Sequence, residues 1–302
     1  MNLNVNLCGY TLKNPLIAAS GTFGYGGEFS AYLDVSRLGG ICSKGLTLHP
    51  REGNPGIRMW ETPAGMLNSI GLQNPGITHF IRHELTYMRK LGTTVIANMG
   101  GGTLEEYIEG ARLLSTADID MLELNISCPN VKAGGIAFGM QPDMAHRVVS
   151  AVREVFAKPL MVKLSPNAPS LAAVAQACES AGADCLSLIN TLLGMAVDIN
   201  RRKPVFANIA AGLSGPAIRP VALRMVYDVA RAVKIPVVGL GGIMTGRDAV
   251  EFIMAGASAV QVGTANLVRP DSMAIILAEL EEFMHTNRIE CLDEIRGCIT
   301  GG

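Results

Sequence analysis

The feature of this sequence that most restricts its fold is the regular alternation of short apolar runs with amphipathic segments. Eight runs have the length and aliphatic content of buried strands. The segments between them place apolar residues at spacings of three and four, which is typical of helices. The predicted strands cover residues 16–19, 40–43, 94–98, 121–125, 160–164, 185–190, 237–240 and 259–262. The predicted helices cover residues 75–90, 104–116, 142–156, 170–182, 216–233, 246–256 and 272–284.

The order of these elements, strand then helix throughout, predicts an α/β fold, the (β/α)8 TIM barrel. A chain of 302 residues fits this fold, which commonly takes about 250 residues. Two doubly wound halves are the alternative, but the sequence has no Pro- or Ser-rich linker that would divide it. We therefore expect residues 1–302 to form a single barrel domain, with an N-terminal β-hairpin around residues 8–11 closing the barrel floor.

Composition narrows the class of ligand. Hydrophobic residues make up 49% of the chain and charged residues 17%, which suits a large covered core. The formal net charge is -1 and basic residues form no long run, so we expect neither nucleic acid nor a polybasic membrane contact. Residues 1–15 lack the features of a signal peptide, and no apolar run approaches about 18 residues. We expect a cytoplasmic protein without a membrane anchor that acts on a small molecule.

The cysteines indicate free thiols rather than a disulfide framework or a zinc site. There are seven of them, an odd number, and no CxxC pair occurs. We expect no bound metal ion. Cys178 and Cys185 fall within a predicted helix and a predicted strand, and Cys42 lies inside another strand, so we assign these three side chains to packing.

Lysines end two of the predicted strands, at the barrel face where active sites are built. Lys44 and Lys163 follow apolar runs, where an unpaired lysine would be costly to bury. One interpretation is a structural ion pair, or a side chain whose charged end reaches solvent. A second, which we favour, is that these cations hold an anion or a carbonyl group. A third is a Schiff-base lysine of the aldolase type, which would have to be desolvated.

Two glycine-containing turns follow the last two predicted strands. They read GLGGI at residues 239–243 and VGTA at residues 262–265. Many barrels bind phosphate here through backbone N–H groups, because glycine lets the main chain approach the anion. Strand-to-helix turns also use glycine for conformational reasons. Two such turns on neighbouring strands nevertheless favour a phosphate site for a substrate or cofactor.

Four asparagines lie at or just beyond predicted strand ends, or in the loop after the second strand. An amide both donates and accepts, so the set suits a flat, neutral ring with alternating C=O and N–H groups, such as a pyrimidine. Taken singly, each could instead cap a turn. The four residues are Asn68, Asn125, Asn130 and Asn190.

Several longer motifs are shared with one enzyme family. They are SKGLTLHPREGNPGIRMWETPAGMLNSIGLQNPG at residues 43–76 and the shorter NISCPN, MVKLSP, LINT and GLGGI. With these motifs the chain resembles the catalytic subunit of class 1B dihydroorotate dehydrogenases over nearly its whole length. The wording TPAGMLNSIGLQNPG separates class 1B from the fumarate-using class 1A homodimers. The resemblance implies an oxidoreductase that converts dihydroorotate to orotate in de novo pyrimidine biosynthesis.

The resemblance also implies cofactors and partners. One FMN per chain would lie on top of the barrel. The chain would form a homodimer associated with an electron-transfer subunit, giving a heterotetramer. That partner subunit would carry FAD and a 2Fe-2S cluster and pass the electrons to NAD+.

Matched position by position, the resemblance implies which residues form the site. The FMN would be bound by Ser20, Lys44, Gly45, Asn98, Asn125, Lys163, Ile189, Gly215, Gly241, Gly242, Gly263 and Thr264. Its phosphate would lie at the last four, where the glycine turns independently predict an anion. The dihydroorotate would be bound by Lys44, Asn68, Ser69, Ile70, Gly71, Leu72, Asn125, Asn130, Asn190 and Thr191.

The resemblance gives Cys128 a catalytic role. Dihydroorotate loses a proton from carbon 5 and a hydride from carbon 6. FMN N5 would take the hydride on one face of the ring, and Cys128 would act as the base on the other face. The glycine-bearing loop at residues 131–139 could close over the substrate and exclude water. A packing role is the alternative for a free cysteine, but the setting between Ser127 and Pro129, beside amides, argues against it.

Other activities remain open at the level of sequence. A class 1A-type homodimer would reduce fumarate without a partner subunit. A dihydropyrimidine dehydrogenase-like flavoenzyme carries a cysteine in a similar loop, but typically has histidine where this chain has Asn130. A flavin-free Schiff-base lyase using Lys163 is the most distant alternative. Membrane-bound class 2 relatives use a serine base and carry an N-terminal extension, whereas position 128 here is cysteine and we expect no such extension.

The assignment of Cys128 can be tested directly. Cys128→Ala should lower turnover roughly 10²- to 10⁴-fold, because a general base is removed, while the protein retains its yellow FMN. An ordinary thiol is mostly protonated at neutral pH, so wild-type turnover should rise toward alkaline pH. Steady-state rates and the visible spectrum of both proteins check this. Unchanged turnover in the variant would remove Cys128 from the mechanism.

Overall fold

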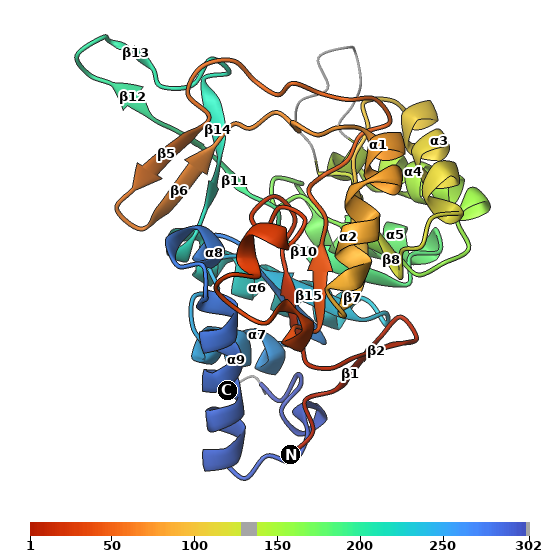
Figure 1. Cartoon of the computed structure of the whole chain (residues 1–302), viewed down its shortest axis with the longest axis vertical. Coiled ribbons are helices and arrows are strands. Elements are labelled where there is room, and N and C mark those ends of the chain that lie inside the picture. The colour runs from red at the N-terminus through yellow and green to blue at the C-terminus, as the bar shows by residue number, and fades with distance from the viewer. Residues whose placement is uncertain (128–137, 300–302) are drawn as a thin grey trace.

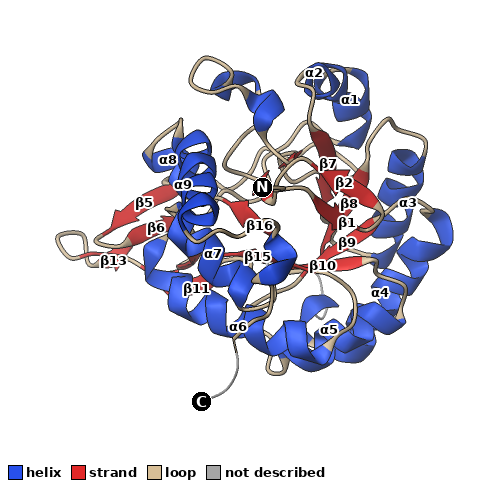
Figure 2. Cartoon of the chain, turned by 90° about the horizontal axis from the view of Figure 1, so that it is seen from below, coloured by secondary structure: helices blue, strands red, loops and turns tan. Residues whose placement is uncertain are grey.

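A closed barrel of eight parallel strands forms the body of the protein, as predicted from the sequence. The structure, a computed structural model, describes residues 1–127 and 138–299. Each strand pairs with the next one along the chain, and the last pairs with the first. Figure 2 shows the ring of strands enclosed by helices. The strands are β3 (Leu16–Ala18), β4 (Gly40–Cys42), β7 (Thr94–Met99), β8 (Met121–Asn125), β9 (Leu160–Lys163), β10 (Cys185–Leu188), β15 (Val237–Leu240) and β16 (Ala259–Val262).

Helices cover the outside of the barrel because each has one apolar face. In α4, for example, the buried residues Ala145, Val148, Val149 and Val152 follow the three-and-four spacing of a helix. The predicted start of α7 is confirmed, since Thr245 and Asp248 form a capping box there. The helices are α1 (Ile77–Arg82), α2 (Glu84–Lys90), α3 (Leu104–Ser115), α4 (Pro142–Val155), α5 (Leu171–Ser180), α6 (Arg219–Ala232), α7 (Gly246–Met254), α8 (Ala265–Val268) and α9 (Ser272–Thr286).

Side chains alternate along each barrel strand between the helical layer and the barrel interior. Leu122 and Leu124 of β8, for instance, belong to the core between strands and helices. Met121 of the same strand belongs to a second core at the floor of the barrel, with Ile96 and Met161 from the neighbouring strands. Glu123 lies between these apolar positions and is fully buried. The strand period of two therefore turns a carboxylate into the barrel.

An N-terminal hairpin closes the floor of the barrel, as predicted. It consists of β1 (Val5–Leu7) and β2 (Tyr10–Leu12), which pair antiparallel across a turn at Cys8 and Gly9. Leu7 and Leu12 are fully buried in the floor core. Thr11, which precedes Leu12 on β2, is exposed to solvent. Figures 1 and 2 show the hairpin lying across this end of the barrel.

A second sheet, which the sequence did not lead us to predict, stands at the opposite end of the barrel (Figure 1). Its four antiparallel strands come from two insertions, one after β4 and one after β10. They are β5 (Met59–Thr62), β6 (Gly65–Asn68), β11 (Leu192–Met195) and β14 (Ala210–Ser214). Between β11 and β14, the short hairpin of β12 (Val197–Asp198) and β13 (Lys203–Pro204) projects away from the barrel.

Element boundaries differ from the predicted ones in two ways. The helix predicted at residues 75–90 is two helices, because the backbone of His83 leaves helical geometry at φ -122° and ψ -71°. Several predicted strands extend past the observed pairing, most clearly at Ile189 and Asn190, where the chain turns into the loop at the barrel mouth. Ile189 is still apolar, and the backbone N–H groups of both residues still donate to Leu240 and Leu164, so the sequence pattern places the boundary too late.

No helix in the described part of the chain combines the length and the apolar character that crossing a membrane requires.

Candidate active site

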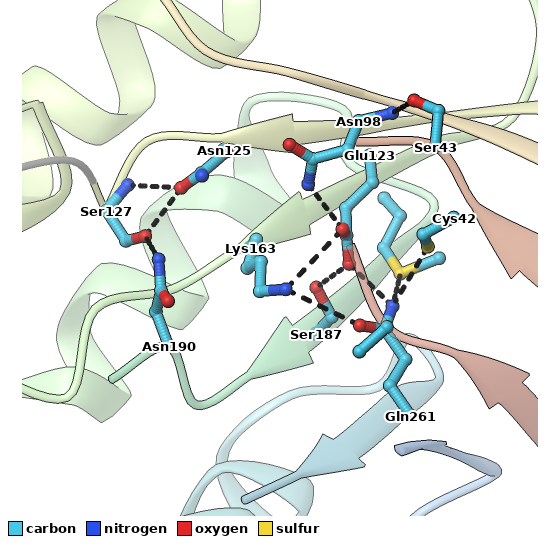
Figure 3. Close-up of polar contacts among 12 residues, drawn as sticks. Cys42, Ser43, Asn98, Glu123, Asn125, Ser127, Lys163, Ser187, Asn190 and Gln261 are labelled. Atoms are coloured by element: carbon cyan, nitrogen blue, oxygen red, sulfur yellow. Dashed lines mark hydrogen bonds and ion pairs between the residues drawn. The ribbon is translucent and has the colours of Figure 1, made fainter. Parts of the chain in front are cut away.

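A polar layer crosses the barrel interior between the apolar floor and the mouth, and Glu123 is at its centre (Figure 3). Its Oε1 accepts hydrogen bonds from Ser187 Oγ at 2.7 Å and Gln261 Nε2 at 2.6 Å. Its Oε2 accepts one from Asn98 Nδ2 at 2.5 Å and lies 3.7 Å from Lys163 Nζ. These donors come from four different strands, β7, β9, β10 and β16. A carboxylate removed from water is thereby surrounded by donors.

The surroundings of Glu123 favour its charged form. Burial is the largest single influence and by itself would raise the pKa of the carboxyl group. The Lys163 cation and the three hydrogen-bond donors together outweigh burial and lower the pKa below the ordinary value for glutamate. Glu123 is therefore an ionised group that can only accept hydrogen bonds.

Lys163 is buried, and it is paired, as one of the interpretations from sequence required. Besides Glu123, its Nζ contacts Gln261 Oε1 at 3.5 Å. Both contacts are long for an ammonium group that has three donors. An ion pair does not suit a Schiff-base nucleophile, which needs an unpaired neutral amine. It does leave Lys163 able to donate to a ligand at the mouth.

Asn98 presents a buried acceptor at the mouth. Its Nδ2 group donates to Glu123, so the other end of the amide, Oδ1, points away from that carboxylate. Within the described residues, this buried Oδ1 has no hydrogen-bond partner. It lies 3.1 Å from where a Cβ of Gly45 would be, and Leu72 and Ser20 border the same point at 3.4 and 3.9 Å. The structure thus brings together four residues that the sequence predicted for the site.

A second network, nearer the mouth, fixes Asn125 and Asn190. The backbone N–H of Ser127 donates to Asn125 Oδ1 at 3.1 Å, and Ser127 Oγ donates to the same oxygen at 2.5 Å. Asn190 Nδ2 donates to Ser127 Oγ, and Asn190 Oδ1 accepts from the Thr191 backbone N–H at 2.8 Å. Because a backbone N–H can only donate, the donor end of the Asn125 amide faces away from Ser127 (Figure 3).

The segment from Asn68 to Leu72 descends from the second sheet to the barrel mouth. Asn68 ends β6, and its Nδ2 donates to the carbonyl oxygen of Gly212 at 3.3 Å. Asn54 braces the segment, since its Nδ2 donates to Ser69 and its backbone N–H donates to the carbonyl oxygen of Ile70. A positive φ at Gly71 and Leu72 turns the chain toward Gly45. The second sheet thus positions five of the predicted substrate contacts.

The predicted phosphate turns form one compact cradle. Gly242 has a φ of +75°, and a Cβ there would lie 2.7 Å from the carbonyl oxygen of Gly215. Thr264 Oγ1 donates to Ser214 Oγ at 2.9 Å, beside Gly215. Gly241 approaches Ile189, which lies 3.4 Å from where a Cβ of Gly241 would be. Backbone approach of this kind is what an anion cradle needs.

Other predicted residues are less connected. Gly263 lies in the turn before Thr264, and a Cβ there would be in ordinary van der Waals contact with Ala19 and Thr22, at 3.7 and 3.9 Å. Lys44 is half-buried just beyond β4, and its carbonyl oxygen accepts from Ser43 Oγ at 3.0 Å. Cys128 and Asn130 lie outside the described residues. In the described ranges, no group of three His, Cys, Asp or Glu side chains is arranged to hold a metal ion.

The cysteines assigned to packing are buried thiols. Burial, together with the neighbouring Glu123 carboxylate, raises the pKa of Cys42 well above its usual range. Burial raises the pKa of Cys178 to about 12 and also raises that of Cys185. Neutral thiols in these positions behave as small apolar groups.

Three members of the polar layer were not among the predicted site residues: Glu123, Ser187 and Gln261. Each stands between apolar neighbours in the middle of a strand, in MLELN, CLSL and AVQV. A polar residue at such a position was a usable signal. The apolar character of the whole strand obscured it, because the functional side chains of a barrel are expected at strand ends.

The fold and the site define the class of protein: a (β/α)8 barrel with a glycine-lined cradle after its last strands and an amide-lined mouth above a buried ion pair. Residues 2–284 match the family described as dihydroorotate dehydrogenase. The chain belongs to this family.

Individual relatives are similar over their whole length. The chain is 54% identical over 299 residues to a protein of Petrotoga mobilis. This match covers 99% of the chain and 100% of the relative. It is 52% identical to a protein of Alkaliphilus metalliredigens and 54% identical to one of Geotalea uraniireducens. Both matches cover 99% of this chain; they cover 99% of the first relative and 98% of the second. All three are named dihydroorotate dehydrogenase B (NAD(+)), catalytic subunit.

The cradle can be tested with Gly242→Ala. The added Cβ cannot fit beside the Gly215 carbonyl and the Arg219 side chain at a φ of +75°, so the turn must move. We expect the dissociation constant for FMN, followed by flavin fluorescence, to rise about tenfold or more. Gly92→Ala is the matched control, because Gly92 has a similar φ of +71° at the opposite end of the barrel but no close neighbour. Equal FMN affinity of the two variants would contradict the assignment.

Proposed function

We propose that this chain is the catalytic subunit of an NAD+-linked dihydroorotate dehydrogenase, which oxidises dihydroorotate to orotate. The observation that carries the proposal is 54% identity over 299 residues to proteins of that name. The mouth of the barrel supports it, because fixed amides suit a pyrimidine ring better than a purely charged ligand. Cytoplasmic location stays a prediction.

FMN is the cofactor that the described residues fit. The cradle of Gly215, Gly241 and Gly242 suits its phosphate. The buried Asn98 Oδ1, which has no partner in the described residues, suits an N–H donor of a ring. Lys163 has donors left for ring acceptors. When bound, FMN would supply the acceptor for the hydride.

The chain's own residues would bind and orient the substrate. Asn125, Asn190 and Thr191 would offer the ring a fixed pattern of donors and acceptors. Ser127 already orients the two asparagine amides, and Asn190 Oδ1 accepts from the Thr191 backbone N–H. Asn68 and the segment to Leu72 would cover the ring from the second sheet. Lys44 would place a cation for the carboxylate. Such preorganisation lowers the cost of orienting the substrate during reaction.

Proton removal is assigned to Cys128. Its Sγ would take the proton from carbon 5 of dihydroorotate, and Asn130 would bind the substrate beside it. Both assignments rest on the family's NISCPN motif, because these residues lie outside the described part of the chain.

The partner proposal follows from the word subunit in the relatives' names. We propose a homodimer of this chain that associates with an electron-transfer subunit carrying FAD and a 2Fe-2S cluster.

The projecting hairpin supports a protein contact at this end of the molecule (Figure 1). Val197 and Ile199 on it are 52% and 80% exposed, and Leu193 and Met195 on the adjoining strand are 56% and 53% exposed. Apolar side chains exposed together in this way are typical of interfaces. We assign this surface to the second copy of the chain.

The reaction is tested by titrating the purified chain with dihydroorotate in the absence of oxygen. The flavin absorbance band should bleach in proportion to added dihydroorotate. Dihydrouracil, which lacks the carboxylate, is the matched control and should bleach it far less. A colourless protein, or a yellow one that dihydroorotate does not bleach, contradicts the proposed function. Equal bleaching by both compounds favours a dihydropyrimidine dehydrogenase-like activity.

Assembly is tested with a tagged chain expressed in its native host. A second polypeptide with iron absorbance should co-purify, and its absence would favour a fumarate-reducing homodimer. Separately, Val197→Ser/Ile199→Ser should lower the mass of the isolated chain from dimer to monomer by light scattering. Both residues stand on the projecting hairpin, so the barrel should stay folded by circular dichroism. An unchanged mass would contradict the assigned dimer surface.

A further inference from the structure

One buried carboxylate touches two of the residues proposed to hold the flavin. Glu123 is 0% exposed and contacts Asn98 at 2.5 Å and Lys163 at 3.7 Å. Glu123 would not touch a flavin bound at the mouth, because Asn98 Oδ1 and Lys163 Nζ lie between its carboxylate and the mouth (Figure 3). Its role is therefore exerted through these neighbours.

Glu123 determines how each neighbouring group is oriented. As an ionised group it can only accept, so the Nδ2 of Asn98 and the Nε2 of Gln261 must both face it. The Oδ1 of Asn98 is then presented at the mouth, and the Oε1 of Gln261 faces Lys163 Nζ at 3.5 Å. Ser187 also donates to it, at 2.7 Å. A neutral group in place of Glu123 that could donate would allow the Asn98 amide to turn over.

Glu123 also determines the charge beneath the mouth. Lys163 is the cation of the polar layer, and the Glu123 carboxylate offsets it at 3.7 Å. Other carboxylates are not part of this layer in the described residues, where its remaining members are Asn98, Ser187, Gln261 and Cys42. Charges interact strongly in a water-excluded interior. The flavin would consequently lie above a nearly neutral pair rather than above a bare cation.

An apolar side chain would fill this layer at a lower desolvation cost. The floor layer just below shows that such packing is available, since Met121 precedes Glu123 on the same strand and packs with Ile96 and Met161. The carboxylate is therefore not needed to fill the barrel, and its charge and its acceptors remain as its distinct contributions.

We propose that Glu123 is a positioning residue that lowers the reduction potential of the bound flavin, by offsetting the Lys163 cation and by presenting Asn98 Oδ1 to the flavin ring. The proposal rests on the proposed function, because it takes FMN as the ligand of the mouth. Electron uptake adds negative charge to the flavin, and a nearby anion opposes this. Dihydroorotate would then meet a weaker oxidant than Lys163 alone would create.

The test is the midpoint potential of FMN bound to the whole chain, measured by anaerobic titration against a reference dye. Glu123→Gln removes one negative charge and keeps the size of the side chain. We expect its midpoint potential to rise by at least about 30 mV, which is a tenfold change for a two-electron couple. Its FMN affinity should fall, because Asn98 is released from its orientation.

A swapped pair separates charge from simple loss of structure. Glu123→Gln/Gln261→Glu keeps one carboxylate and one amide in contact, and places the carboxylate where Gln261 Oε1 now lies 3.5 Å from Lys163. We expect this double variant to return toward the wild-type potential. If Glu123→Gln does not fold, Glu123→Met serves instead, because the layer below already packs Met121 and Met161 in the same interior. It also removes the anion, and its potential should rise by the same margin.

Two results would overturn the proposal. One is a folded, FMN-bound Glu123→Gln, or failing that Glu123→Met, with the wild-type potential. The other is a double variant as strongly shifted as Glu123→Gln. Failure of the proposed function looks different, because wild-type protein would then contain no flavin or would not be bleached by dihydroorotate.

Discussion

A carboxylate enclosed in a closed barrel must be surrounded by donors, and this requirement organises the interior of the protein. Glu123 is satisfied by Asn98, Lys163, Ser187 and Gln261, which come from four other strands. Each of these side chains is fixed in turn by the same carboxylate. Losing one partner would leave a buried charge incompletely paired, which is far more costly than losing a surface ion pair. The arrangement at the mouth is built on this layer.

Apolar and polar side chains occupy different levels along the axis of the barrel. Apolar side chains fill the floor, and the N-terminal hairpin closes it with Leu7 and Leu12. The polar layer follows, then the amides at the mouth, and then the second sheet, which delivers the segment from Asn68 to Leu72. The polar groups of the candidate site are thus gathered at one end, where strand ends and inserted segments meet, which is where barrels of this fold carry their active sites.

Much of this architecture was predictable. The period of two in the strands and of three and four in the helices predicted the eight-fold repeat. The glycine turns after the last two strands predicted a phosphate site there, and this stays a prediction. Lys163 was predicted as a ligand-holding cation with a structural ion pair as the alternative, and the structure shows that it is paired. The second sheet was not predicted. Its strands are short, and β6 pairs with β14, about 145 positions away, so no local pattern reveals it.

Sequence by itself determined the repeating elements, the turns that glycine permits and the family, because these depend on local periodicity, on backbone conformation and on motifs that are continuous along the chain. Only the tertiary structure decided which polar groups meet. Glu123 and Gln261 are 138 positions apart and are joined at 2.6 Å. Closure of the barrel brings β8 and β16 to opposite sides of one narrow interior, and desolvation there forces their side chains to satisfy one another. That contact depends on the closed sheet, which no single segment specifies.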